Sequence, residues 1–187
     1  LAAMGILGLV IAVFVGTGLV NKEIEKRTVL VLIAKPVSRA EFILGKHLGL
    51  SALLALLISL MTIIYLVILL IWRVPFPLGS ILISIVYLFF ELSLLTAVAI
   101  LFGVFTNSLL AILLTFGIYL MGHLSPDLIK LGQLSKNLSR LDLKNQAVYG
   151  IGALPNAEML LLNVLYAFLY IALLLSISIV VFSRREF

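Results

Sequence analysis

The feature that most constrains this chain is a series of long stretches without charge. Residues 1–20, 48–72 and 159–183 contain no charged residue, and residues 74–126 contain only Glu91. A run of about 18 or more apolar residues can cross a bilayer as a helix. Charged residues make up 11% of the chain, against about 25% in soluble domains. The sequence therefore excludes a water-soluble globule and predicts an all-α polytopic membrane protein, because the strands of a β-barrel would alternate apolar and polar residues.

The apolar runs divide one transmembrane domain, residues 1–187, into spans and two longer connections. The connections are residues 21–46 and residues 124–157. The five predicted spans lie at about residues 1–20, 47–72, 80–105, 109–123 and 158–182. Because residue 1 already lies inside an apolar run, we expect the natural chain to begin earlier. In the second connection, leucines at helical spacing with Lys and Arg between them predict an amphipathic helix at the membrane surface.

The first connection, residues 21–46, holds the densest group of charges in the chain. Apolar residues near helical spacing predict a short amphipathic helix over residues 22–35. Pro36 ends this helix, because the residue before a proline avoids the helical region. Ser38 and Glu41 have the S-x-x-E spacing of a capping box, which predicts that a new helix begins there.

This second helix is predicted to run from Arg39 to Ile71 without a break. At about 1.5 Å per residue it would be about 50 Å long. The hydrocarbon core of a bilayer is only about 30 Å thick, so the first turns of the helix should stand outside the membrane.

The distribution of basic residues leaves two topologies open. If all five runs cross, residues 21–46 and the C-terminus share one side, which carries eight of the 13 Lys and Arg residues. If residues 109–123 are re-entrant, residues 124–157 join residues 21–46, and the division becomes ten against three. The positive-inside rule places the richer side in the cytoplasm in both cases.

Few residues in the predicted spans are ionisable or could act in catalysis or metal binding. Glu91 is the one ionisable group deep in a predicted span, and such groups are costly and often functional. We expect either a structural role for it or a role in a substrate path or subunit interface. His47 and His123 fall at predicted membrane edges, without a second ligand nearby, so no metal site is expected. The chain has no Cys, and no catalytic constellation stands out. The net charge of +5 lies in the connections and is not a nucleic-acid signal.

The string EIEKRTVLVLIAKPVSRAEFILGK, residues 23–46, resembles the permease subunits of ABC-2 type ABC transporters. It is most similar to the branch described as permeases for multi-copper enzyme maturation. Many members have Gly before the threonine, where this chain has Arg27. The endings LPNAEMLLLN and FSRREF are also similar. The residues that match the family pattern are Glu23, Thr28, Leu32, Pro36, Val37, Ser38, Arg39, Gly45 and Lys46.

The resemblance implies a type V exporter-like bundle of six spans, of which these five would be the second to the sixth. It makes residues 21–46 a cytoplasmic coupling segment and residues 124–157 an extracytoplasmic loop. The coupling segment would dock on a cytoplasmic ATPase subunit. The residues expected to form or orient this docking surface are Glu23, Glu25, Arg27, Thr28, Leu32, Pro36, Ser38 and Arg39.

The expected function is therefore export by a prokaryotic cell-membrane permease that is not itself an enzyme. The chain contains no G-x-x-x-x-G-K-[ST] motif, so ATP and Mg²⁺ are expected on the partner ATPase subunits. A second permease subunit, identical or not, and membrane lipids are the other expected partners. An ion channel or ion-coupled carrier that uses Glu91 is the alternative, and a membrane scaffold without transport is a third class. The substrate is not predicted.

Overall fold

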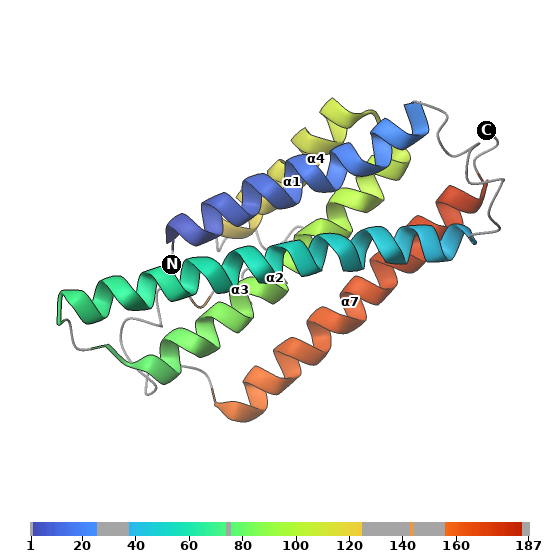
Figure 1. Ribbon diagram of the computed structural model, residues 1–187. Coiled ribbons are helices and arrows are strands. Elements are labelled where there is room, and N and C mark those ends of the chain that lie inside the picture. Colours follow the sequence, from blue (N-terminus) through green and yellow to red (C-terminus); the bar gives the residue numbers. More distant parts are fainter. Residues whose placement is uncertain (1, 26–37, 74–75, 125–142, 144–155, 185–187) are drawn as a thin grey trace.

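The computed structural model describes residues 2–25, 38–73, 76–124, 143 and 156–184 (Figure 1). These residues confirm an all-α polytopic membrane protein. Among them, α2, α3 and α7 are long and apolar enough to cross a membrane, and the apolar parts of α1 and α4 are shorter. The helices are α1 (Ala2–Glu25), α2 (Arg39–Ile71), α3 (Leu78–Phe105), α4 (Ser108–Leu124) and α7 (Ala157–Arg184).

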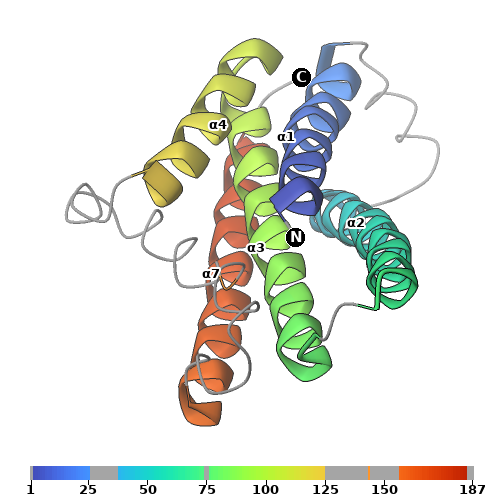
Figure 2. The same cartoon turned by 90° about the vertical axis from the view of Figure 1, so that its left-hand side faces the viewer.

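Helix α3 is the centre of the bundle, and each of the other four helices packs against it. Figures 1 and 2 show it running between α1 and α2 on one side and α4 and α7 on the other. Every residue from Glu91 to Ile100 is buried. Ten consecutive residues point in every direction around a helix. Protein therefore covers the whole circumference of this part of α3.

Helix α1 lies against α3 through small residues at every fourth position. Gly8, Ala12 and Gly16 are all buried, and residues four apart share one face of a helix. A Cβ atom on Gly8 would lie 2.2 Å from Leu92 Cδ1, and one on Gly16 would lie 3.0 Å from Ala99 Cβ. Small residues at this spacing let membrane helices approach closely.

The predicted start of α2 is confirmed. Ser38 is the N-cap, and the helix runs from Arg39 to Ile71. The backbone N–H of Glu41 donates to Ser38 Oγ at 3.1 Å, and the N–H of Ser38 donates to Glu41 Oε2 at 2.8 Å. These two bonds satisfy N–H groups that have no partner within the helix. They therefore stabilise the start of a helix at this point.

The start predicted for the amphipathic helix at residue 22 is wrong. Helix α1 continues without interruption through Asn21 and Lys22 to Glu25. Residues 22–25 contain neither Gly nor Pro, and Lys and Glu are good helix formers, so nothing ends the span where its charges begin. The remainder of that prediction, residues 26–35, lies outside the described residues.

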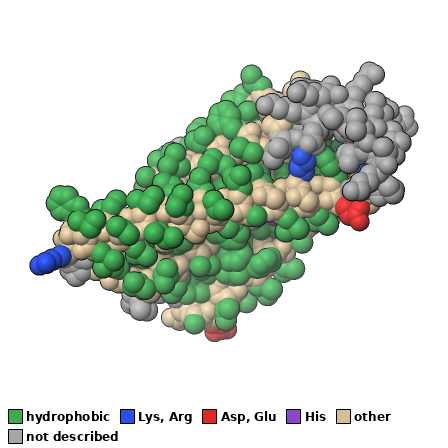
Figure 3. Space-filling model, in the orientation of Figure 1, with side chains coloured by type: hydrophobic (Ala, Val, Ile, Leu, Met, Phe, Trp, Pro, Cys, Tyr) green, Lys and Arg blue, Asp and Glu red, His purple; other side chains and the backbone are tan. Residues whose placement is uncertain are grey.

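The surface of the bundle fits a lipid environment. Large apolar side chains are exposed along α2 and α7, including Leu56, Leu60 and Leu70 on α2 and Leu161 and Leu169 on α7. Figure 3 shows hydrophobic side chains covering the length of the bundle, with the charged ones towards its two ends. In water such a surface would be an aggregation site, whereas in lipid it is the expected exterior.

We predict that Gly8→Leu destabilises the bundle, because its side chain must displace Leu92 at the contact between α1 and α3. Overpacking of this kind costs about 1–3 kcal/mol. Gly18→Leu is the matched control, since a Cβ there meets nothing within 4 Å. Thermal unfolding of the detergent-solubilised protein should show a lower midpoint for Gly8→Leu than for Gly18→Leu. Equal midpoints would contradict the close contact.

Candidate functional site

The predicted docking residues fall into three groups in the structure. Ser38 and Arg39 begin α2 and are exposed. Glu23 and Glu25 belong to the last turns of α1, where the backbone alone is described. The other four, Arg27, Thr28, Leu32 and Pro36, lie outside the described residues. The structure therefore gives side-chain contacts for only two of the eight.

Arg39 is engaged within the chain, at the C-terminal end of α7. Its Nη1 donates to the carbonyl oxygens of Phe182 at 3.1 Å and Ser183 at 2.5 Å. The last carbonyls of a helix have no partner within the helix. They also form the negative end of its dipole, where a cation is favourable. Arg39 thus caps α7, a role that sequence reasoning did not assign to it.

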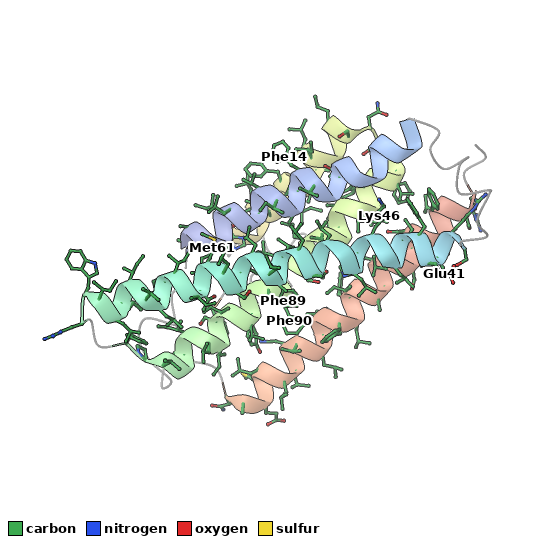
Figure 4. The ribbon with its side chains drawn as sticks, viewed as in Figure 1. Phe14, Glu41, Lys46, Met61, Phe89 and Phe90 are labelled. Atoms are coloured by element: carbon green, nitrogen blue, oxygen red, sulfur yellow. The ribbon has the colours of Figure 1, made fainter. Side chains whose placement is uncertain are left out.

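An aromatic contact reinforces the same junction. The rings of Phe42 and Phe182 stack with centroids 5.7 Å apart. Lys46 Nζ lies 5.4 Å from the centroid of the Phe42 ring, within the range of a cation–π contact. Figure 4 shows Glu41 and Lys46 on the first turns of α2, at the end where α7 finishes. The α2–α7 junction, meaning Arg39, Phe42, Phe182 and Ser183, joins the first turn of one helix to the last turn of another.

Glu91 forms the second candidate site, together with His123. Glu91 is 1% exposed, and its Oε1 lies 3.1 Å from Nε2 of His123 at the end of α4. The ring of His123 stacks on that of Tyr119, one turn earlier, at 4.2 Å. Its Nδ1 lies 3.1 Å from the Tyr119 carbonyl oxygen. This pair holds the end of α4 against the middle of α3.

The hydrogen positions of the Glu91–His123 pair follow from its surroundings. A carbonyl oxygen can only accept, so Nδ1 of His123 carries a proton. Nε2 and Oε1 lie within ion-pair distance, and an imidazolium beside a carboxylate would have no net charge. A buried acid is tolerated in low-dielectric surroundings because it is paired in this way.

The two histidines, which were expected at membrane edges, both lie against α3. His123 lies against Glu91, near the middle of α3, and His47 is 6% exposed. A hairpin argument could have found the first contact. The stretch of α3 from Glu91 to Phe105 is about 21 Å long, and that of α4 from Ser108 to His123 is about 22 Å. Antiparallel helices of equal length joined by a two-residue turn bring their far ends together.

The comparisons with known proteins give one result. A family model described as ABC-2 family transporter protein matches residues 2–187. No curated protein and no solved structure matches the chain.

We predict that Arg39→Gln loosens the end of α7. The change removes the cation from the helix C-terminus, at a cost of about 1 kcal/mol. Amide hydrogen exchange should become faster in the last turn of α7. Arg73→Gln serves as the control, because Arg73 follows the opposite end of α2 and should leave α7 unchanged. Unaltered exchange in Arg39→Gln would show that the guanidinium does not cap the helix.

We also predict a non-additive double-mutant cycle for the Glu91–His123 pair. Glu91→Leu and His123→Leu should each lower the free energy of unfolding by about 1–3 kcal/mol, because each leaves a buried polar partner behind. The double variant should lose less than the two single losses combined. Additive losses, measured by unfolding in mixed micelles, would mean that the two groups do not interact.

Proposed function

Because the chain belongs to the ABC-2 family of transporter proteins, which makes it a permease component of an ABC transporter, we propose that it couples ATP hydrolysis on separate ATPase subunits to export of a substrate. The coupling segment is residues 21–46, which include the end of α1 and the first turns of α2. Closure of the ATPases displaces this segment, and rigid-body movement of the attached helices changes access to the transport path. The permease itself contributes no catalytic residue.

The single observation that carries this proposal is the α2–α7 junction. The coupling segment contains the first two turns of α2, which are rigid because of the capping box. Arg39 and Phe42 fasten that first turn to the end of α7. A displacement at the start of α2 is therefore carried to two membrane-crossing helices rather than one.

We extend the proposal to the branch of the family, the membrane, the second subunit and the topology. The string KPVSR at residues 35–39 supports a place in the branch of permeases for multi-copper enzyme maturation. A prokaryotic cell membrane and a second permease subunit follow from the same resemblance. The first of the six expected spans would precede α1, and residues 124–157 would lie outside the cell.

The Glu91–His123 pair favours a second candidate, an ion-coupled carrier. A buried acid beside a histidine is the kind of pair that a proton-driven carrier uses. In the present proposal the pair instead fixes α4 to α3. The two functions differ in their source of energy, which makes them separable by experiment.

We predict that the tagged full-length protein, purified from its native membrane, brings an ABC ATPase subunit with it. Glu25→Lys and Thr28→Asp should reduce the recovered ATPase, because they change the charge of the coupling segment. Arg73→Gln, at the other end of α2, should not.

Failure of the unmodified protein to recover any ATPase would contradict the proposal. Transport in proteoliposomes separates the two candidates. Transport that requires the ATPase and survives Glu91→Gln fits the permease. Transport driven by a proton gradient alone, and abolished by Glu91→Gln, fits the carrier.

A further inference from the structure

A hollow of about 520 Å³ lies between α2, α3 and α7. Its volume is within the range of about 300–1,000 Å³ that is typical of small-molecule sites. Most of its wall is apolar or aromatic, and Figure 4 shows Phe89 and Phe90 on the α3 side. The ring of Phe90 meets that of Phe168 of α7 edge to face at 5.2 Å. We call this hollow the α2–α3–α7 groove.

The imidazole of His47 is a polar group in the otherwise largely apolar wall of the groove. His47 of α2 lines it and is 6% exposed. Its Nδ1 lies 3.3 Å from the hydroxyl oxygen of Thr96 on α3. Within the described residues, this is the one hydrogen bond of the imidazole ring. Because Nδ1 is turned towards Thr96, Nε2 is the ring nitrogen that an occupant of the groove can reach.

The neighbours of His47 decide which nitrogen carries the proton. The Thr96 hydroxyl donates to the carbonyl oxygen of Ser93 at 2.7 Å. A hydroxyl has one hydrogen, so in its contact with His47 it accepts, and Nδ1 must be the donor. None of the residues that line the groove is acidic, and an unpaired buried ion is costly. The imidazole is therefore neutral, and Nε2 presents a lone pair without a hydrogen.

Two further hydroxyls lie beside this acceptor. Ser51 Oγ of α2 and Ser93 Oγ of α3 are 3.2 Å apart, and both residues line the groove. By contrast, a second hollow of about 510 Å³ between α3 and α7 has an apolar wall. Its one polar side chain, Tyr87, donates its hydroxyl to the Leu160 carbonyl. Of these two hollows, the α2–α3–α7 groove is the one that combines a hydrocarbon-like wall with an available acceptor.

We propose that the α2–α3–α7 groove binds a single-chain amphiphile whose head group is an uncharged hydrogen-bond donor. The hydrocarbon chain lies along the wall of the groove, against the rings of Phe89, Phe90 and Phe168. The head donates an O–H or N–H to Nε2 of His47. A carboxylate head is disfavoured, because it offers no hydrogen to a nitrogen that itself has none. Binding of this kind does not depend on an ATPase partner.

The test uses the full chain in lipid nanodiscs and a long-chain primary alcohol with a photoreactive diazirine on its chain. The matched alkane, with the same diazirine and no hydroxyl, is the reference probe. The alcohol should label the groove segments of α2, α3 and α7 more strongly than the alkane does. One neutral hydrogen bond corresponds to a preference of about two- to tenfold.

Substitutions at His47 test the hydrogen bond. His47→Leu should abolish the preference for the alcohol while leaving alkane labelling in place. His47→Gln, whose amide oxygen is again an acceptor, should retain the preference. Equal labelling by the two probes in the unmodified chain, or an unchanged preference in His47→Leu, would overturn the proposal.

A substitution that fills the groove provides an independent check. Ala172 is an exposed residue of α7 that lines the groove, and Ala172→Trp should suppress labelling by both probes. Ala55→Trp is the matched control, because Ala55 is exposed on α2 outside the groove. Labelling that persists in Ala172→Trp, or that lies elsewhere on the bundle, would place the amphiphile on the general lipid surface and overturn the proposal.

Discussion

The structure depends on the burial of α3 by the other four helices. In lipid, apolar surface gains little by leaving the solvent, so helices associate through close packing and polar contacts. Both are concentrated on α3. Gly8 and Gly16 of α1 bring that helix within contact of Leu92 and Ala99. The polar contacts from α3 reach His123 on α4, His47 on α2 and the Leu160 carbonyl on α7. Each outer helix is therefore oriented by what it meets on α3.

Sequence reasoning was successful where the governing interaction is local. The capping box at Ser38 and Glu41 depends on residues three apart, and it correctly predicted the start of α2. The uninterrupted apolar run that follows correctly predicted its end at Ile71. The apolar runs likewise predicted the class of protein. The start of a separate helix at residue 22 was wrong because charge marks the membrane surface and does not by itself end a helix.

The side-chain contacts of the candidate sites could not be predicted in this way, because they join distant residues. Arg39 and Ser183 are 144 positions apart. The residues next to Arg39 in the sequence do not reveal whether its side chain contacts α7 or an ATPase. The contact between Glu91 and His123 is the exception, because the two-residue turn between α3 and α4 makes it accessible to a hairpin argument. The His47 acceptor depends on the hydrogen-bond direction of Thr96, which only the arrangement of α2 against α3 creates.

The α2–α7 junction and the α2–α3–α7 groove are parts of one arrangement. Helices α2 and α7 are fastened together at Arg39 and Phe182, and the groove lies between them a few turns further along, with α3 as its floor. His47 follows Arg39 by eight positions, or about 12 Å of helix. Because the junction is a fixed point, a tilt of α2 about it changes the width of the groove more with increasing distance from Arg39. If residues 21–46 act as the proposed coupling segment, their position and the shape of the groove would be mechanically related through α2.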